Sequence, residues 1–413
     1  MSFYSGGEVR TKIIDPVNDI TNTRSEFRLD DLGAVMSNMK LINIGCKSSA
    51  GSKEYSDITG TYGIIKNISL KDGNTELSSC RDANFWLGWK NLNMSNSENE
   101  SLNKFVSKSN LGFFSDSESG KQGESRIAEG IVSDTEKDDE KGHLELRMIL
   151  PLLLSLRSLD NLRFKRLRLV VEYDKDIKDF MNTDNVPVST YRPSLVVDVI
   201  EDEGVRNSEL QNSPSSVNWI EIEKDSFIVP AVPVSAGTIR ATQNTTHKVN
   251  AFNNKTLSRV LLQKTNSDKT KNFSANTRIG SLGSGSIGQY LQKTQYRVNG
   301  SNLLSGAGVE GSNQRMALLV DTWGDINQSL GGNILGGHTG GFTDEGANRK
   351  GNFDYDGIFV GKAVKDFQIL LERVGVYNNG VQAQDINQLT VNVYGEVNKN
   401  IQMKGDEYLI SYN

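Results

Sequence analysis

Short runs of alternating or β-branched apolar residues recur along the whole chain, whereas helical periodicity is scarce. The clearest run is Leu167–Tyr173, in which every second residue is apolar while Arg168 and Glu172 fall on the opposite face. Because successive side chains of a strand point to opposite faces, this run predicts a half-buried strand. The pattern as a whole predicts a mostly β protein.

Runs of this kind predict strands in both halves of the chain. In the first half these strands are Ser25–Leu29, Met39–Cys46, Tyr62–Leu70, Leu144–Leu150, Leu167–Tyr173 and Leu195–Ile200. In the second half they are Val217–Ile222, Lys248–Phe252, Ser258–Gln263, Tyr290–Val298, Ala317–Asp321, Phe367–Arg373, Leu389–Val397 and Tyr408–Tyr412. The best helix candidate is Cys80–Leu92, whose aromatic residues are spaced to pack on one side, namely Phe85, Trp86 and Trp89.

A charged and then Ser- and Pro-rich stretch separates the two halves. It covers Asp202–Ser208 and continues to Pro214–Ser216, a composition that suits a linker. The chain has 413 residues, and compact domains hold roughly 100 to 200 residues each. We therefore expect two β domains, one over residues 1–205 and the other over residues 206–413.

Three long irregular segments interrupt the strands, namely Asn91–Gly142, Thr265–Gly288 and Gly331–Gly351. Connections longer than about 12 to 15 residues are uncommon in a compact domain unless they are functional or disordered. Short strands with long excursions are typical of the jelly rolls of viral capsids and lectins, and enzyme lids are the other common reason. We expect Asn91–Gly142 to be a surface excursion, because its composition cannot fill a core.

Charge and hydropathy narrow the classes of partner. The chain has 46 basic and 51 acidic side chains, a formal net charge of −5, whereas a protein that wraps phosphate needs a basic excess. The densest basic spot, Phe164–Arg168, opens an amphipathic strand whose outward face must be polar in any case. The longest apolar stretch, Met148–Leu156, is far shorter than the roughly 20 residues that cross a bilayer. We expect a soluble protein without specific nucleic-acid binding.

Cysteines and histidines provide no recognisable reactive group. Cys46 and Cys80 fit neither a disulfide framework nor the paired spacing of a zinc site, so we expect two buried thiols in a reducing compartment. His143, His247 and His338 lie in unrelated segments, and none has a second His or Cys close by in sequence. We therefore predict no catalytic, cofactor-binding or metal-binding residues.

Two further motifs lack the context that their chemistry needs. Gly283–Gly288 matches G-x-G-x-x-G, but the residues that follow predict a strand, whereas a phosphate-binding turn must open a helix. The carboxylate run Asp134–Lys141 lacks the mid-loop glycine and the terminal glutamate of a calcium loop. No G-x-S-x-G nucleophile elbow is present. We expect Gly283–Gly288 to be a flexible loop and Asp134–Lys141 to be a solvated charge run. We also expect no cofactor and no enzyme activity.

Several strand-like stretches carry a resemblance to a known family. Gly60–Gly73 (GTYGIIKNISLKDG) precedes the Cys80–Trp89 segment, and the sequence closes with Gln388–Ile401 and Tyr408–Tyr412. Similar stretches lie between them, at Gln295–Gly300 and Leu319–Gly324. Together these stretches resemble the double-jelly-roll major capsid proteins of tailless icosahedral DNA viruses, of the polinton-like virus, adintovirus and virophage type.

The resemblance implies a fold, a function and partners. The fold would be all-β, with two consecutive antiparallel jelly-roll barrels, long inserted loops and few short helices. The function would be that of a structural major capsid protein, whose homotrimers form pseudo-hexameric capsomers and assemble an icosahedral virion shell inside the host cell. Partners would be further copies of the chain, neighbouring capsomers, and penton and other minor capsid proteins, while an internal membrane is left open. The family has no catalytic residues to transfer.

Three other functions stay open on the sequence. A jelly-roll carbohydrate-binding or fibre protein would use aromatic platforms such as Trp323 or Tyr290, and it would bind sugar without forming a shell. A penton-type minor capsid protein would have a single barrel. A β-rich enzyme with Gly-rich lids would show a concave pocket with convergent titratable groups.

Overall fold

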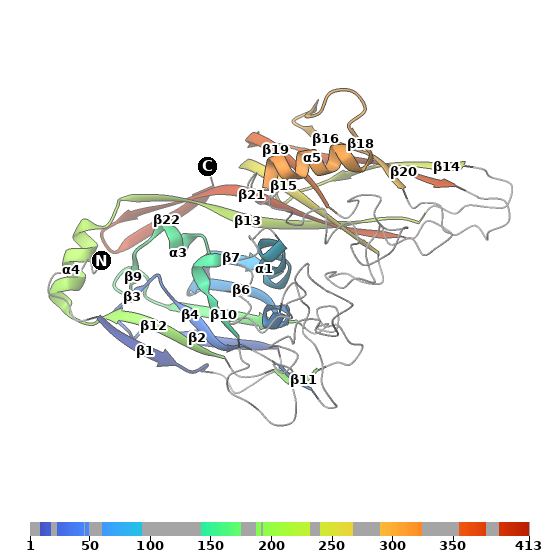
Figure 1. The fold of residues 1–413 in the computed structure, drawn as a ribbon. Coiled ribbons are helices and arrows are strands. Elements are labelled where there is room, and N and C mark those ends of the chain that lie inside the picture. Colours follow the sequence, from blue (N-terminus) through green and yellow to red (C-terminus); the bar gives the residue numbers. More distant parts are fainter. Residues whose placement is uncertain are drawn as a thin grey trace. The chain divides into compact units, whose positions relative to one another are not determined.

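The structure is a computed structural model, and it describes residues 9–17, 23–44, 46–48, 60–92, 142–174, 187–190, 193–231, 240–266, 290–323, 355–376 and 388–412. The chain forms two compact units. Unit 1 consists of Met1–Asn91, Asn96–Glu221 and Asn398–Asn413, and unit 2 consists of Leu92–Ser95 and Ile222–Val397. Each unit is built mainly from strands (Figure 1), so the prediction of a mostly β protein is confirmed.

Unit 1 contains two main sheets. The first has the order β8-β4-β12-β3-β9, with β1 paired to β12. Its strands are β1 (Val9–Ile14), β3 (Ala34–Met36), β4 (Lys40–Ile44), β8 (Gly142–Glu145), β9 (Ser158–Asp160) and β12 (Ser194–Ile200). The second sheet has the order β2-β10-β6-β7. Its strands are β2 (Arg24–Arg28), β6 (Ile65–Asp72), β7 (Thr75–Arg81) and β10 (Leu167–Tyr173).

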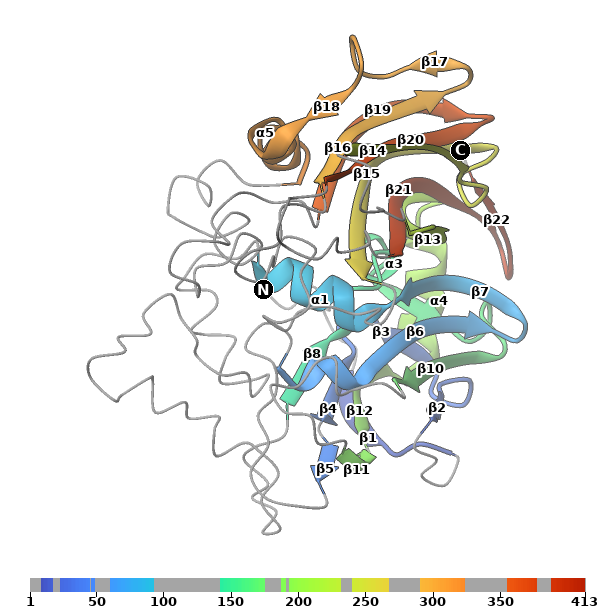
Figure 2. The same ribbon diagram turned by 90° about the vertical axis from the view of Figure 1, so that its right-hand side faces the viewer.

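Strand β10 shows how the sequence pattern produces the second sheet. Its alternate residues from Leu167 to Tyr173 are buried, and it pairs with β2 on one side and β6 on the other. Figure 2 shows β10, β6 and β7 running side by side. A short separate pair joins β5 (Cys46–Ser48) to β11 (Pro187–Thr190). Every strand pairing within the two main sheets, and that of β5 with β11, is antiparallel.

Short helices complete unit 1. They are the 3-10 turns η1 (Gly60–Ile64) and η3 (Leu146–Met148), and the α-helices α1 (Ala83–Leu92), α3 (Leu152–Ser155) and α4 (Glu203–Asn212). The predicted helix Cys80–Leu92 is found as α1, and its three aromatic residues are all buried. The strand predicted at Leu144–Leu150 is wrong beyond Glu145, because the chain turns into η3 and then α3, which Pro151 precedes.

The predicted linker at Asp202–Ser208 is instead the start of helix α4. The side chain of Asp202 accepts a hydrogen bond from the backbone N–H of Val205 at 2.8 Å, which satisfies one of the free donors at the helix N-terminus. No residue of this helix is buried, and its composition is therefore polar, like that of a linker. The boundary expected between residues 205 and 206 falls inside α4, and the units part between Glu221 and Ile222. The assignment of one jelly roll to residues 1–205 and one to 206–413 stays a prediction.

Unit 2 is built on two further sheets. The first has the order β13-β21-β15-β19, with β22 paired to β21, and the second has the order β14-β20-β16-β17, with β18 paired to β16. The first sheet contains β13 (Ser216–Val229), β15 (Lys255–Asn266), β19 (Tyr355–Val364), β21 (Leu389–Lys404) and β22 (Glu407–Tyr412). The second contains β14 (Arg240–Lys248), β16 (Tyr290–Val298), β17 (Ser301–Asn302), β18 (Val309–Glu310) and β20 (Phe367–Val376). Residues 216–221 of β13, residues 398–404 of β21 and all of β22 belong to unit 1.

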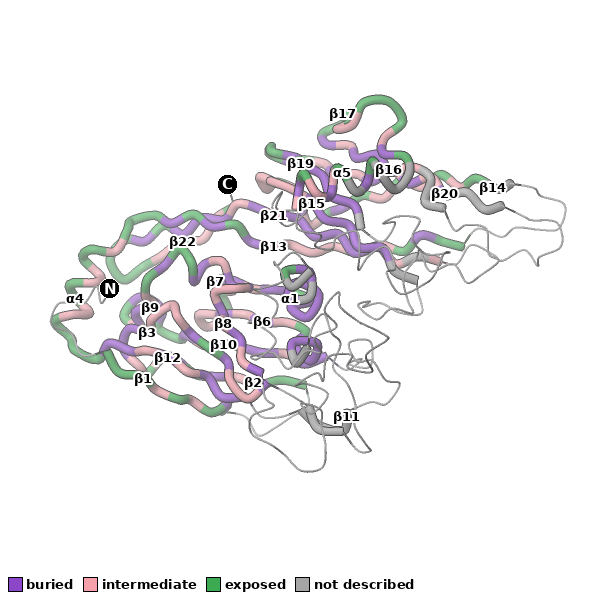
Figure 3. Tube along the Cα trace, viewed as in Figure 1, coloured by how far each residue is buried: buried purple, intermediate pink, exposed green. Residues whose placement is uncertain are grey.

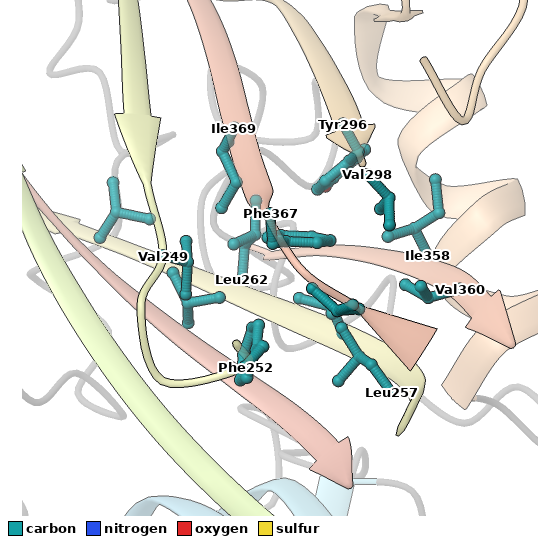
Figure 4. Close-up of a cluster of buried hydrophobic side chains, with 14 of the residues drawn as sticks. Val249, Phe252, Leu257, Leu262, Tyr296, Val298, Ile358, Val360, Phe367 and Ile369 are labelled. Atoms are coloured by element: carbon teal, nitrogen blue, oxygen red, sulfur yellow. The ribbon is translucent and has the colours of Figure 1, made fainter. Parts of the chain in front are cut away.

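One hydrophobic core joins the two sheets of unit 2. Side chains from β15, β19 and β21 interlock with side chains from β16 and β20 (Figure 4). The rings of Phe252 and Phe367 meet edge to face, with centroids 5.6 Å apart. Gly395 leaves room for Phe252, because a Cβ atom at this position would lie 2.5 Å from a carbon of that ring. The alternation of buried and exposed residues along these strands is visible in Figure 3.

Two strands predicted in unit 2 are wrong. Ala317–Asp321 lies in helix α5 (Gly311–Trp323), where Arg315, Leu319 and Thr322 are all buried at helical spacing. A short apolar run cannot distinguish a buried strand from a buried helix by periodicity alone. In the segment Lys248–Phe252 only Lys248 belongs to a strand, as the last residue of β14, and the chain then enters a turn.

Candidate functional site

The described histidines and cysteines lie on four different strands. His143 lies on β8 of unit 1, His247 lies on β14 of unit 2, and His338 lies outside the described residues. Cys80 is buried in β7, and burial raises the pKa of its thiol above the ordinary value. The backbone of Cys46 lies in β5. In the described part of the chain no group of three or more His, Cys, Asp or Glu side chains could hold a metal ion.

Other sequence candidates fall in segments that the structure does not describe. These are Gly283–Gly288, Asp134–Lys141, residues 93–141 of the segment Asn91–Gly142, residues 267–288 of the segment Thr265–Gly288, and all of Gly331–Gly351. The predicted absence of catalytic, cofactor-binding and metal-binding residues therefore stays a prediction. No helix in the described ranges is long and apolar enough to span a membrane.

The basic spot Phe164–Arg168 is engaged within unit 1. Phe164 is buried, and its ring packs 5.0 Å from the ring of Tyr408. Arg168 forms an ion pair with Glu26 at 3.0 Å and donates to the carbonyl of Gly73. Arg168, the basic residue of strand β10, thus has partners within the fold.

The carbohydrate-binding alternative uses Trp323 or Tyr290 as an aromatic platform for a sugar. Trp323 donates its ring N–H to the carbonyl of Val260 at 3.0 Å, and the guanidinium of Arg259 lies 4.1 Å from the ring centroid. Arg259 is fixed in this position by two hydrogen bonds to the carboxylate of Glu396, at 2.6 and 2.9 Å. One face of the Trp323 ring is therefore covered by a cation, which does not suit a sugar platform. Tyr290 begins β16.

A buried charge cluster, the Asp356 cluster, ties α5 to the sheets of unit 2. Its members are Asp356, Lys264, Arg315 and Thr294. All four are buried, with an exposed fraction of 3% or less. Lys264 Nζ lies 2.6 Å from Asp356 Oδ2, and Arg315 Nη1 lies 3.0 and 2.9 Å from the two carboxylate oxygens. Burial alone raises the pKa of Asp356, but the charges of Arg315 and Lys264 outweigh it and hold the pKa below its usual value.

A second buried cluster, the Glu221 cluster, lies in unit 1. The Glu221 carboxylate accepts hydrogen bonds from the Ser78 hydroxyl, the Ser79 backbone N–H and the ring N–H of Trp219. Lys399 lies over the Trp219 ring at 5.6 Å and donates to a backbone carbonyl of β7. Burial raises the pKa of Glu221 above its usual value, even though Lys399 and these donors act in the opposite direction.

These two clusters were missed in the sequence interpretation, although a signal was available. Glu221 follows Val217 and Trp219 at every second position, so it stands on the apolar face of β13. Asp356 likewise alternates with the buried residues Ile358 and Val360 of β19. A charged residue on the apolar face of a strand predicts a buried polar partner. The identity of that partner depends on strands far away in sequence.

We expect the stability of a Glu221→Gln variant, relative to the natural protein, to rise with pH. The folded-state pKa of Glu221 lies above its unfolded value, so its contribution is fully present below the unfolded pKa and is lost as pH rises through the folded pKa. Glutamine does not titrate and escapes this loss. Urea unfolding between about pH 5 and about pH 8 measures the difference, and a difference independent of pH would contradict the raised pKa.

Exposed apolar residues mark candidate contact surfaces. On β1, Val9 is 39% exposed and Ile13 is 68% exposed, and the register places Ile13 beside Val196 of β12. Among the described residues β1 pairs with β12 alone, so it is an edge strand of its sheet. Further exposed apolar side chains are Val17, Leu154, Leu162, Ile220, Ile228, Phe359, Leu409 and Tyr412. We call Val9 and Ile13 the β1 apolar pair.

Similarity to known proteins is found in structure only. No protein-family model matches the sequence, and no curated protein matches it. The fold is similar to that of VP54 of PBCV-1, whose crystal structure was fitted into a cryo-EM reconstruction of the virophage Sputnik. The two share 10% identity over 100% of this chain and 99% of the other, with a TM-score of 0.60.

Two more solved structures agree with this similarity. The major capsid protein of mavirus is 10% identical over 97% of this chain and 90% of its own, with a TM-score of 0.52. The Sputnik virophage structure from cryo-EM is 12% identical over 100% of this chain and 90% of its own, with a TM-score of 0.51. The chain therefore has the double-jelly-roll fold of major capsid proteins, and the expected fold class is confirmed.

Proposed function

We propose that the protein is a non-enzymatic structural protein, the major capsid protein of a DNA virus, and that it resides in the capsid of the virion. The observation that carries this proposal is the fold match over 100% of the chain to VP54 of PBCV-1. A penton-type protein with one barrel does not account for a match over both units. The buried charge clusters serve stability in this proposal, since each ties strands or helices together within one unit.

The proposed assembly unit is a homotrimer. Two sheet sandwiches per chain become six around a three-fold axis, so the trimer can tile a hexagonal lattice as a pseudo-hexameric capsomer. Neighbouring capsomers close the icosahedral shell in this proposal. Penton and other minor capsid proteins are the further partners, and an internal membrane is a candidate surface beneath the shell.

The mass of the purified protein tests the trimer. Light scattering coupled to size exclusion is expected to give about 137 kDa, three times the 45.6 kDa of the chain. Electron microscopy of concentrated protein should then show capsomers or shells. A monomeric mass at micromolar concentration, with no particles, would remove the capsid proposal. Saturable sugar binding by such a monomer would favour the carbohydrate-binding alternative.

We expect Ile13→Asp to weaken trimer formation strongly if the β1 apolar pair lies in a subunit contact. An aspartate there would be an unpaired charge taken out of water on assembly, which costs several kcal/mol, so the association constant should fall on the order of 100-fold. The same side chain is 68% exposed in the isolated chain, so the fold itself should tolerate the change.

Ile13→Thr is the matched control for this variant, because threonine keeps the β-branched shape and adds no charge. Light scattering across a dilution series compares the two variants with the natural protein. If Ile13→Asp assembled as well as Ile13→Thr, the β1 apolar pair would not be part of a subunit contact.

A further inference from the structure

Unit 1 contains a pocket whose lining is largely polar and charged. Its volume is about 640 Å³, and it lies between the α3–β9 connection, helix α4 and the end of β21. Its lining includes Arg157, Arg163, Ser208, Glu209 and Met403. This volume lies within the range of pockets that hold small molecules or short peptides.

Arg163 is the exceptional residue of this lining. It is only 8% exposed, and yet each of its hydrogen bonds goes to a neutral atom. Its Nε donates to the carbonyl of Gly405 at 3.0 Å, and its Nη1 contacts Ser213 Oγ at 3.2 Å and Met403 Sδ at 3.1 Å. A guanidinium has five N–H donors, and its second terminal nitrogen, Nη2, has no partner among the described residues.

The acidic residues near Arg163 are engaged elsewhere. Asp160 accepts two hydrogen bonds from Arg206, and Asp406 lies 3.4 Å from Lys165. Burial lowers the pKa of Arg163, and the more distant charges of Asp160 and Asp406 do not offset it. The nearly buried guanidinium of Arg163 thus has no carboxylate in contact among the described residues, and an oxyanion beside it would compensate its charge.

The other charges of the lining are already satisfied within the fold. Arg157 forms an ion pair with Glu209 at 3.4 Å, and Asp202 caps helix α4. Only Arg163 therefore offers free N–H donors together with an uncompensated positive charge. Two N–H groups on one terminal nitrogen suit an oxyanion acceptor.

We propose that this pocket binds a short acidic peptide segment of another polypeptide, with a carboxylate of that segment seated on the guanidinium of Arg163. The pocket is far larger than a lone inorganic anion requires, and its serine hydroxyls and paired charges can meet the polar groups of a peptide backbone. This proposal does not depend on the capsid role, because it concerns the pocket of a single chain.

The probe is a pool of N-acetylated tetrapeptides, each with one Asp or Glu, which is placed at every position in turn. The comparison pool has Asn or Gln in place of the acidic residue. Retention on the immobilised full-length protein, read by mass spectrometry, should favour the acidic pool at least about tenfold, as expected for a charge-assisted hydrogen bond. Arg163→Gln should abolish this preference. Equal retention of both pools, or a preference unchanged in Arg163→Gln, would overturn the proposal.

Three controls separate the causes of any loss. Lys165→Gln removes the same charge two residues away, outside the pocket, and should keep the preference. Ser208 lines the pocket at an exposed position of α4, so Ser208→Trp should fill the pocket without disturbing the core. This variant should abolish binding, and it tests the proposal even if Arg163→Gln fails to fold. Inorganic phosphate tests whether the pocket binds a small oxyanion instead of a peptide carboxylate. If phosphate stabilised the protein against heat while the acidic pool was retained no better than the amide pool, the pocket would be a small-anion site and the peptide proposal would be wrong.

Discussion

Replacing Asp356 with alanine is expected to lower the free energy of unfolding by about 3 to 5 kcal/mol, because it leaves two buried cations without their shared anion. Lys264 and Arg315 are both 0% exposed at the side chain in their ion pairs with Asp356. The loss should also release α5 from β19, since Arg315 is the charged contact of that helix with Asp356. Urea unfolding followed by circular dichroism measures the change.

Asp406→Ala is the control for this prediction. Asp406 also forms an ion pair with a lysine, Lys165, but their side chains are 69% and 66% exposed. An exposed pair of this kind is worth about 0 to 1 kcal/mol, so the control should unfold almost as the natural protein does. Both variants must be compared at equal protein concentration, because assembly adds to the apparent stability. If the two variants lost the same small amount, the Asp356 cluster would contribute little to stability.

In the core of unit 2, Phe252→Ala and Gly395→Ala are expected to be non-additive. Phe252→Ala alone should cost about 3 to 5 kcal/mol, because the ring is fully buried against Phe367 and its removal leaves a cavity. Gly395→Ala alone should cost about 1 to 3 kcal/mol, because the new methyl group would lie 2.5 Å from a carbon of the Phe252 ring.

In the double variant the methyl group of residue 395 enters space that the missing ring has vacated. We expect the combined cost to be smaller than the sum of the single costs by at least about 1 kcal/mol. Urea unfolding of the four proteins completes the cycle. A combined cost equal to the sum would mean that the two positions are not in contact, contrary to the structure.

The strands that could be predicted from the sequence are those with a strong local pattern. Leu167–Tyr173 and Tyr290–Val298 match β10 and β16 at both ends, and Tyr408–Tyr412 matches β22 within one residue. Leu167–Tyr173 has an apolar residue at every second position, which is the signal of a half-buried strand. The similarity to double-jelly-roll capsid proteins was likewise visible in such stretches, and the fold confirms it.

The elements that could not be predicted are those whose burial is decided by distant residues. Strand β14 has the sequence RATQNTTHK, which has no apolar alternation, and it is fixed by its pairing with β20. Helix α5 contains an apolar run that fits a strand equally well, and its helical face is decided by contacts of Arg315 and Trp323 with strands far away in sequence.

The pocket around Arg163 lay beyond sequence reasoning for the same reason. In the sequence, Arg163 is one of several basic residues beside Phe164–Arg168, and nothing local sets it apart. Its burial depends on Ser213 after α4 and on Met403 and Gly405 near the end of β21, which are 50, 240 and 242 residues away. These segments are far apart in sequence, and together they determine which nitrogens of the Arg163 guanidinium have hydrogen-bond partners.

The division of the two units along the chain has a consequence for biosynthesis. Unit 1 takes strands from residues 398–412, which leave the ribosome after everything in unit 2. Those residues supply fully buried Ile401 and the hydrogen bond from Tyr408 to Asp72 at 2.8 Å, so the earlier part of unit 1 cannot reach its final packing without them. Unit 2 is in effect an insertion between segments of unit 1. A nascent or truncated chain that lacks these residues therefore cannot present a finished first unit.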